Sequence, residues 1–224
     1  MSRLFAWLGG ALFTLSLAYC AWWYIVPLGN PAPAGGWPAA GADAALLTLF
    51  ALHHSLFARG WMKVRVVRLV PAELERSVYV WIASALLVLV VALWRRVGGT
   101  LYQSTGPAAI AHAALQLFGV WLITRAVAGI DPLELAGIRR QPTCGELQTA
   151  GPYGWVRHPL YLGWVIAVFG TAHMTGDRLA FASMTTAYLM IAVPWEERSL
   201  VKSFGEDYRR YQKRVRWRIV PYVF

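Results

Sequence analysis

Residues 151–164 read GPYGWVRHPLYLGW, and residues 194–215 read PWEERSLVKSFGEDYRRYQKRV. Two apolar segments lie between these ends, joined by the short sequence Gly-Asp-Arg at 176–178. If both segments are membrane helices, so tight a turn makes them an antiparallel hairpin, and the two ends meet on one side of the membrane. Charged groups gathered there against apolar walls are costly unless they bind something. We therefore expect the functional site here, with the preceding chain as the membrane body around it.

The composition excludes an ordinary soluble domain. The chain has 224 residues, of which 58% are hydrophobic and 14% charged. This balance is typical of a polytopic membrane protein. The two cysteines, Cys20 and Cys144, lie in unlike settings and indicate neither a disulfide framework nor a metal cluster. The basic residues flank apolar segments, so the net charge of +10 indicates membrane topology and no nucleic-acid partner.

The hydrophobic pattern predicts an all-α, polytopic helical bundle with about six transmembrane helices. Residues 1–150 form a transmembrane body of four helices with a cytoplasmic loop at 59–77, and residues 151–224 form the hairpin and a C-terminal helix of the same integrated domain. The Pro- and Gly-rich stretch 27–43 is expected to be an irregular loop. The six expected spans are 4–26, 44–57, 78–94, 108–130, 160–175 and 179–195.

The distribution of basic residues predicts the orientation of these helices. With the N-terminus in the cytoplasm, 17 Lys and Arg residues fall on the inner side and 3 on the outer side. By the positive-inside rule both termini and the expected site face the cytoplasm. We expect the membrane to be a bacterial inner membrane. The stretch 196–218 carries apolar residues at helical spacing with basic residues between them. It predicts an amphipathic helix that contacts membrane lipid or covers the mouth of the hairpin.

The start of the hairpin has features of a ligand site. Pro159 suits the first position of a helix, where nearby backbone N–H groups are free to hold an anion. His158 and Tyr161 are three residues apart and share a helix face, and Gly163 allows a ligand to approach the backbone closely. Each residue alone also fits a structural role, as a cap or a member of an interfacial aromatic belt. Together with the glutamates at the other end of the hairpin, they favour a site.

Two adjacent carboxylates end the second hairpin helix. Glu196 and Glu197 oppose the helix dipole there, so positive charge has to compensate them. The candidates are Arg157, Arg198 and the cationic groups of a bound ligand. An ordinary ion pair with one of the arginines explains one of the two glutamates equally well.

A family resemblance rests on the sequence Arg-His-Pro-Leu-Tyr-Leu-Gly at 157–163 and on the spacing of the residues that follow Glu196-Glu197. This pattern resembles the membrane methyltransferases that include isoprenylcysteine carboxyl and phospholipid methyltransferases. The resemblance implies S-adenosyl-L-methionine as the methyl donor. It implies that one glutamate, preferentially Glu197, contacts the donor and that Arg157 lies near the reacting groups. The donor-binding residues that we expect are Tyr153, His158, Pro159, Tyr161, Gly163, Glu196 and Glu197.

A second resemblance points to the acceptor. The sequences LHHSLFAR at 52–59 and PAELERSVYV at 71–80 look like the bacterial methanethiol S-methyltransferase branch. A thiol attacks well only as a thiolate. We therefore expect a base, His54 or Glu197, to act with Arg157 in favouring the thiolate of a small acceptor. The neighbouring His53 fits a hydrogen bond between helices as well as a substrate pocket.

Two alternative functions stay open at this stage. The acceptor can be a lipid-like molecule, either an isoprenylated cysteine carboxylate or a phospholipid headgroup. Alternatively, the chain is a haem-binding or non-catalytic membrane protein, with His112 and His173 as axial ligands at similar depth. The sequence does not fix the oligomeric state.

Overall fold

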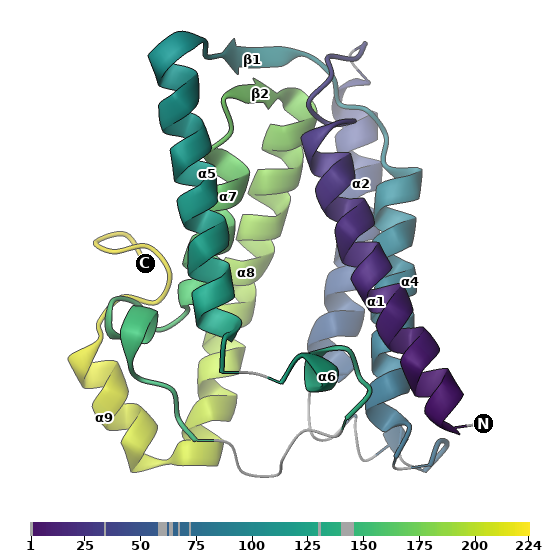
Figure 1. Ribbon diagram of the computed structural model, residues 1–224, viewed down its shortest axis with the longest axis vertical. Coiled ribbons are helices and arrows are strands. Elements are labelled where there is room, and N and C mark those ends of the chain that lie inside the picture. The colour runs from purple at the N-terminus through teal and green to yellow at the C-terminus, as the bar shows by residue number, and fades with distance from the viewer. Residues whose placement is uncertain are drawn as a thin grey trace. The chain divides into compact units, whose positions relative to one another are not determined.

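A computed structural model describes residues 2–33, 35–57, 62, 65–66, 68–71, 73–129, 131–139 and 146–224. The described chain is mostly helical (Figure 1). It divides into two compact units, each assembled from separated segments of the chain. The first unit contains residues 1–99, 130–142 and 175–177, and the second unit contains residues 100–129, 143–174 and 178–224. Cys144 and part of the basic loop predicted at 59–77 lie outside the described residues.

The first unit is built on three long helices, α1 (Ser2–Ile25), α2 (Gly36–Phe57) and α4 (Glu75–Leu93). Both α1 and α2 pack against α4. Gly9 lets α1 approach α4 closely, because a Cβ there would lie 2.7 Å from the Trp81 indole nitrogen. That nitrogen donates to the Phe5 carbonyl oxygen at 3.0 Å. The short helix α6 (Pro132–Leu135) belongs to the same unit, and its Asp131 cap accepts from the Leu133 backbone N–H.

A buried carboxylate organises one end of the first unit. Asp177 is fully buried and accepts hydrogen bonds from the Trp94 indole and from the backbone N–H groups of Val97 and Gly98. Arg96 completes the set with an ion pair of 3.0 Å. The Gly-Asp-Arg sequence at 176–178, predicted as the turn between two helices, is instead the first turn of a helix.

The second unit contains most of the predicted hairpin. Helix α5 (Gly106–Val127) packs against α7 (Pro159–Phe169), and α8 (Gly176–Phe204) continues into α9 (Glu206–Arg214). A short 3₁₀ helix, η1 (Gly151–Gly154), precedes α7. The strands β1 (Thr100–Gln103) and β2 (His173–Thr175) form a two-stranded sheet. The sequence interpretation had assigned β1 to a loop and had contained no sheet.

Helices α7 and α8 run antiparallel, as predicted. The Trp164 indole of α7 donates to Thr185 of α8 at 3.0 Å, and the start of α7 contacts the end of the apolar part of α8. The prediction was wrong about length, because α7 ends at Phe169 and not at residue 175. Its 11 residues extend about 16 Å, roughly half the thickness of the hydrocarbon core.

Four helices of the described chain are long and apolar enough to cross a membrane, namely α1, α2, α4 and α5. These correspond to the first four predicted spans. The predicted count of six is not confirmed. The second span begins earlier than expected, because α2 starts at Gly36 inside the stretch that was predicted to be a loop. Proline at the beginning of a helix is compatible with helical geometry, which is why Pro38 does not prevent this start.

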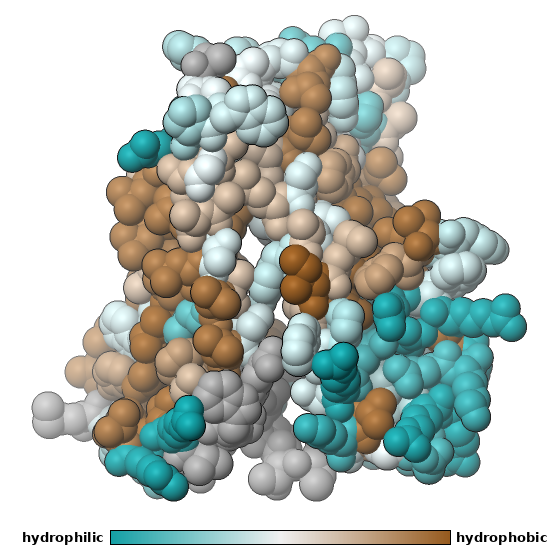
Figure 2. All heavy atoms as spheres, turned by 180° about the vertical axis from the view of Figure 1, so that it is seen from behind, coloured by the Kyte–Doolittle hydropathy of each residue, from teal (hydrophilic) through white to brown (hydrophobic). Residues whose placement is uncertain are grey.

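The expected single helix over 196–218 is divided. Helix α8 runs through Glu196 and Glu197 to Phe204, and Gly205 then adopts a φ of +56°. This left-handed conformation favours glycine and ends the helix. Helix α9 follows to Arg214, with Tyr208 and Tyr211 buried. Hydrophilic side chains gather at the end of the second unit that carries α9, whereas much of the surface above it is hydrophobic (Figure 2).

Candidate active site

The start of α7 and the end of the apolar part of α8 form a cluster of aromatic and carboxylate groups within the second unit. The rings of His158 and Tyr161 stack with centroids 5.3 Å apart and planes 6° apart. The Tyr161 hydroxyl donates to Glu196 Oε2 at 2.8 Å, and His158 Nδ1 lies 3.6 Å from the same oxygen. The structure therefore brings together the four residues on which the sequence interpretation of the site depended: His158, Tyr161, Glu196 and Glu197.

Glu197 is the most heavily compensated carboxylate of this cluster. Its side chain is 6% exposed, and Oε1 accepts from Arg157 Nε at 2.6 Å. Oε2 accepts from Gln212 Nε2 at 3.3 Å and lies 3.3 Å from Arg218 Nε. By contrast, the Glu196 side chain is 42% exposed. Glu197 is thus held among cations, while Glu196 keeps a surface open to a ligand.

The electrostatic environment keeps Glu197 ionised. Burial raises the pKa of its carboxyl group, but His158 and Arg157 outweigh this effect and lower the pKa to about 2. Glu197 lies beyond Trp195, after the apolar part of α8, so its charge is at the polar end of the helix. A carboxylate held ionised by its own cations contributes little uncompensated charge to a ligand.

Arg157 connects this cluster to the C-terminal tail, residues 215–224. Besides its ion pair with Glu197, its Nη1 donates to the carbonyl oxygens of Val215 at 2.7 Å and Arg216 at 2.8 Å. Its backbone N–H donates to the Trp217 carbonyl oxygen at 2.9 Å. The guanidinium is therefore engaged by the protein itself, in an arrangement that holds the tail against the start of α7.

The tail also occupies backbone donors that were expected to be free. Pro159 begins α7, as predicted, but the Arg157 and His158 N–H groups both donate to tail carbonyls. The N–H groups of Tyr161 and Leu162 donate to the His158 carbonyl oxygen. The expectation that the N–H groups at this helix start hold a donor carboxylate is wrong for these four groups.

Gly163 serves the packing of two helices. A Cβ at this position would lie 2.7 Å from the Gly119 carbonyl oxygen of α5 and 2.9 Å from the Ile123 backbone nitrogen. A Cβ at Gly119 would in turn lie 2.7 Å from the Gly163 carbonyl oxygen. The two glycines allow the backbones of α5 and α7 to touch, which is a common way for membrane helices to associate. This packing explains the glycine without a ligand.

Tyr153, another predicted donor-binding residue, belongs to an aromatic core. It packs with Tyr208, Tyr211 and Val215, and its hydroxyl donates to the Ala126 carbonyl oxygen at 3.2 Å. Burial, and then the charge of Glu196, raise the pKa of the Tyr153 hydroxyl. The Tyr211 hydroxyl donates to the Tyr153 carbonyl oxygen at 2.7 Å. Tyr153 therefore holds α9 and η1 together.

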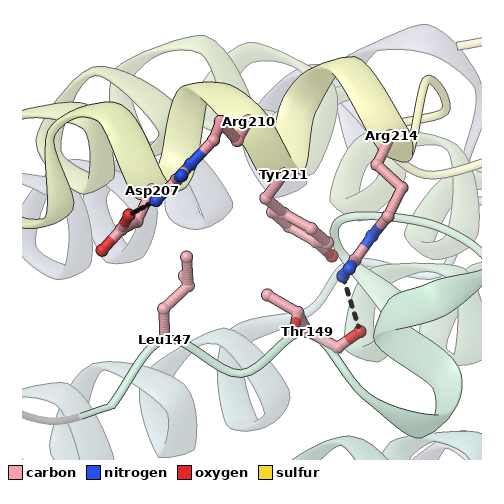
Figure 3. Close-up of a pocket in the computed structure, with 6 residues that line it drawn as sticks. All are labelled: Leu147, Thr149, Asp207, Arg210, Tyr211 and Arg214. Carbon is pink, nitrogen blue, oxygen red and sulfur yellow. Dashed lines mark hydrogen bonds and ion pairs between the residues drawn. The ribbon is translucent and has the colours of Figure 1, made fainter.

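A cavity of about 450 Å³ lies between α9 and the segment that precedes η1 (Figure 3). Its charged groups are already engaged: Arg210 pairs with Asp207, and Arg214 donates to the Thr149 carbonyl oxygen at 3.4 Å. The predicted site residues are not among the described residues that line it, which are Leu147, Thr149, Asp207, Arg210, Tyr211 and Arg214. We therefore centre the candidate site on the paired glutamates.

His54, the proposed base, belongs to the first unit. Its Nδ1 shares a hydrogen bond of 2.8 Å with the Tyr79 hydroxyl. The neighbouring His53 is buried and stacks on Phe57 and Tyr79. This places His54 beside Tyr79 of the segment 71–80, which carried the second family resemblance.

The two histidines of the haem alternative have separate local contacts. His112 stacks on Tyr102, and its Nδ1 lies 3.2 Å from the Gly170 carbonyl oxygen. His173 Nε2 lies 3.5 Å from Thr100 Oγ1. Over the residues that the structure describes, no group of three or more His, Cys, Asp or Glu side chains is arranged to hold a metal ion.

Sequence reasoning missed three residues of the cluster: Gln212, Arg218 and Tyr208. The first two contact Glu197, as described above. Tyr208 lies in the stretch 196–218 and was given no role in the site, but it is 1% exposed, and burial and then the negative charge of Glu197 raise the pKa of its hydroxyl. Tyr208 and Tyr211 are among the apolar residues at helical spacing in the stretch 196–218, and both are buried in the structure. No sequence pattern identified Arg218, because it follows the helix in an irregular tail.

Comparisons with known proteins identify relatives of this chain. A family model described as phospholipid methyltransferase matches residues 107–207. Methanethiol S-methyltransferase 2 of Bradyrhizobium diazoefficiens is 34% identical over an alignment of 237 residues, which covers 99% of this chain and 90% of the relative. Methanethiol S-methyltransferase of Pseudomonas deceptionensis is 36% identical over 193 residues, covering 82% and 74% of the two chains.

A shorter match is to a protein that is named for a different activity. Protein-S-isoprenylcysteine O-methyltransferase of Xenopus laevis is 38% identical over 72 residues, which is 31% of this chain and 25% of the relative. No solved structure matches the chain.

These findings define the chain as a membrane methyltransferase. It belongs to the family that includes these methanethiol S-methyltransferases, and it is accordingly an enzyme. The resemblance read from the sequence is confirmed. Because its relatives are named as methyltransferases, the haem-binding and non-catalytic alternatives are disfavoured.

Proposed function

We propose that this chain is an integral membrane methyltransferase that uses S-adenosyl-L-methionine to methylate a small thiol such as methanethiol. The observation that carries the proposal is the juxtaposition of a stacked His158–Tyr161 pair with two carboxylates, one of them half exposed. The donor presents a cationic sulfonium and an ammonium group, which carboxylates and aromatic faces recognise. When bound, the donor supplies an electrophilic methyl group.

Glu196 is the better candidate for contact with the donor ammonium. Its carboxylate is 42% exposed and has only Tyr161 and His158 as its described polar partners. Glu197 already accepts from Arg157 and Gln212. We therefore assign Glu196 to the ligand and Glu197 to the framework, in place of the initial preference for Glu197. Pro159 and Gly163 support the site by starting and packing α7, and Tyr153 supports it from below.

Transfer to a thiol requires few groups from the protein. The acceptor S–H first loses its proton to a base, and the thiolate electron pair then attacks the methyl carbon as the donor C–S bond breaks. The products are a thioether and neutral S-adenosylhomocysteine. The chain has to orient the two sulfur atoms and exclude water. His54 is our candidate base, because the other candidate, Glu197, is already engaged by Arg157.

The names of the relatives and the sequence support a small thiol acceptor. The two methanethiol S-methyltransferases align with most of this chain, whereas the isoprenylcysteine O-methyltransferase aligns with less than a third of it. The charge distribution supports a bacterial inner-membrane location with both termini in the cytoplasm, where the donor is available. The exposed basic residues of α9 then face anionic lipid.

Calorimetric titration of the detergent-purified protein with S-adenosylhomocysteine tests the donor site. We expect saturable binding that weakens about 10-fold or more in Glu196→Gln and His158→Ala, since hydrogen bonds to charged groups contribute roughly 1.5–3 kcal/mol. Arg209→Ala is the matched control, because this exposed residue pairs only with Glu206 among the described residues. A folded parent protein that does not bind the product would overturn the proposal.

A second assay identifies the acceptor. The purified enzyme is supplied with labelled donor and, in separate reactions, methanethiol, a farnesylated cysteine or phosphatidylethanolamine. We expect label in dimethyl sulfide and none in the two lipid-like products. The opposite result would replace the thiol with a lipid-like acceptor while leaving the donor site intact.

A further inference from the structure

The Tyr208 hydroxyl is an unusual group within the second unit. Tyr208 is 1% exposed, and its hydroxyl oxygen has no hydrogen-bond partner among the residues that the structure describes. A hydroxyl moved from water into an apolar interior without a partner costs free energy, so buried polar atoms in folded proteins are nearly always paired. An unpaired hydroxyl at this position therefore points to a partner outside the described residues.

The position of Tyr208 connects it to the candidate site. Its ring packs in the cluster with Tyr211 and Val215, and the charged groups that act most strongly on its hydroxyl are Glu197 and Arg157. Burial, followed by the negative charge of Glu197, raises the pKa of this hydroxyl. The group therefore keeps its proton at neutral pH and can donate it in a hydrogen bond.

A second buried polar atom without a hydrogen bond among the described residues belongs to His158. His158 is 5% exposed, and its Nε2 has no hydrogen-bond partner among the described residues, although it lies 3.5 Å from Glu197 Oε1. Thr186 also has an unpaired buried oxygen in the second unit, but it lies well within α8 and away from the paired glutamates in sequence. His158 Nε2 thus still has Glu197 as an electrostatic partner, so the Tyr208 hydroxyl is the stronger indication of a ligand.

The neighbouring Tyr211 shows what a structural tyrosine looks like in this helix. It lies three residues further along α9, is also buried, and donates its hydroxyl proton to the Tyr153 carbonyl oxygen at 2.7 Å. The two tyrosines share the apolar cluster but differ in hydrogen bonding. The hydrogen bond of Tyr211 indicates a packing role, and the unpaired hydroxyl of Tyr208 on the same helix face indicates a binding role.

We propose that Tyr208 is a donor-binding residue whose hydroxyl forms a hydrogen bond with a polar group of the bound S-adenosyl compound. Helix α9 is then part of the active site as well as a surface helix. The proposal rests on the proposed function, because it names a further contact in the same donor site. It assigns a role to a residue that neither the family motif at 157–163 nor the paired glutamates include.

The test compares Tyr208→Phe with Tyr211→Phe in two measurements, affinity for S-adenosylhomocysteine by calorimetry and thermal unfolding in detergent. Both variants keep the ring and lose one hydroxyl, so both are expected to fold. For Tyr208→Phe we expect the Kd to increase about 3- to 10-fold, because a neutral hydrogen bond contributes roughly 1 kcal/mol. We expect its Tm to stay the same or rise, since the ligand-free protein loses an unsatisfied polar group.

Tyr211→Phe should show the reverse pattern, a Tm lowered by several degrees with the Kd changed less than twofold. An unchanged Kd for Tyr208→Phe would overturn the proposal. So would a weaker Kd accompanied by a loss of Tm equal to that of Tyr211→Phe, because the hydroxyl would then have a structural partner such as an ordered water. If the parent protein does not bind the product at all, the proposed function itself fails, and the assignment of Tyr208 fails with it.

Discussion

Arg157 and Glu197 form an ion pair of 2.6 Å although they lie 40 residues apart in the sequence. Their side chains are 7% and 6% exposed. A charge pair buried to this degree is expensive to break, because the remaining partner is left without compensation. The pair therefore ties the start of α7 to the end of the apolar part of α8, and the tail carbonyls on Arg157 extend this connection to the C-terminal tail.

Replacing either partner should destabilise the protein strongly. We expect Arg157→Ala or Glu197→Ala to lower the free energy of unfolding by about 3–5 kcal/mol. Arg216→Ala, which removes an exposed arginine from the same tail, should change it by about 0.5 kcal/mol or less. Denaturant unfolding in detergent, followed by tryptophan fluorescence, measures these differences. Equal effects of Arg157→Ala and Arg216→Ala would show that the buried ion pair contributes no more to the free energy of unfolding than an exposed arginine does.

The ion pair also predicts how stability depends on pH. The Glu197 pKa is about 2 in the folded protein against an ordinary value of 4.5, so folding favours the ionised form. The stabilisation is fully present above the unfolded pKa and is lost as the pH falls from about 4.5 through about 2. Unfolding curves over this range should show a decrease that is smaller in Glu197→Gln. An identical slope in both proteins would contradict the assignment of this effect to Glu197.

The close approach of α5 and α7 makes Gly163 sensitive to a single added methyl group. Gly163→Ala should lower the free energy of unfolding by about 1–3 kcal/mol, because the new Cβ would clash with backbone atoms that cannot move independently. Gly154→Ala is the matched control, since no atom lies within 4 Å of the corresponding Cβ. Thermal unfolding compares the two variants. If Gly163→Ala keeps its Tm but loses affinity for S-adenosylhomocysteine, the glycine serves a ligand and not the packing of the helices.

Arg218 is expected to influence the site through Glu197. Its Nε lies 3.3 Å from the Glu197 carboxylate, and its guanidinium lies 5.1 Å from the centre of the Phe224 ring. Arg218→Ala should lower the free energy of unfolding, measured with denaturant in detergent, by about 0.2–1 kcal/mol, the effect of a partly exposed ion pair. Arg218→Lys should restore part of this loss, because it keeps the charge. If Arg216→Ala has the same effect, the loss reflects the net charge of the tail and not the contact with Glu197.

The proposed role of His54 predicts a loss of turnover without a loss of donor binding. His54→Ala should lower kcat for methanethiol about 100-fold or more, a usual contribution of a general base. The Kd for S-adenosylhomocysteine should stay within about twofold, because a base for the acceptor does not hold the donor. Tyr79→Phe removes the 2.8 Å hydrogen bond to His54 and should have a smaller effect. Full turnover in His54→Ala would remove this residue from the mechanism.

Much of the helical architecture follows from the apolar pattern. The four long spans and the antiparallel arrangement of α7 and α8 were predictable, because length, hydropathy and the position of Pro159 act locally. The length of α7 was misjudged, since the predicted span 160–175 was extended past Phe169 into residues that form a strand. Hydropathy does not distinguish a buried strand from the last turns of a helix.

The candidate site, too, was predictable only in part. The proximity of His158 and Glu196 follows from the hairpin, but the partners of Arg157 do not. Two of them are main-chain carbonyl oxygens, which every residue has and no side-chain pattern reveals. Gly163 was interpreted as room for a ligand because a sequence does not show which helix lies opposite it. The contact with Gly119 supplies that information.

The contacts of Arg157 also determine when the site can be completed during protein synthesis. Glu197 is synthesised 40 residues after Arg157. The carbonyl groups of Val215 and Arg216 are synthesised 58 and 59 residues after Arg157. At a usual elongation rate the last of these partners emerges roughly 3 to 12 s after Arg157. During this interval a nascent chain carries an arginine whose final partners do not yet exist. A chain that stops before the tail therefore lacks the carbonyl partners of Arg157, and its candidate site is incomplete.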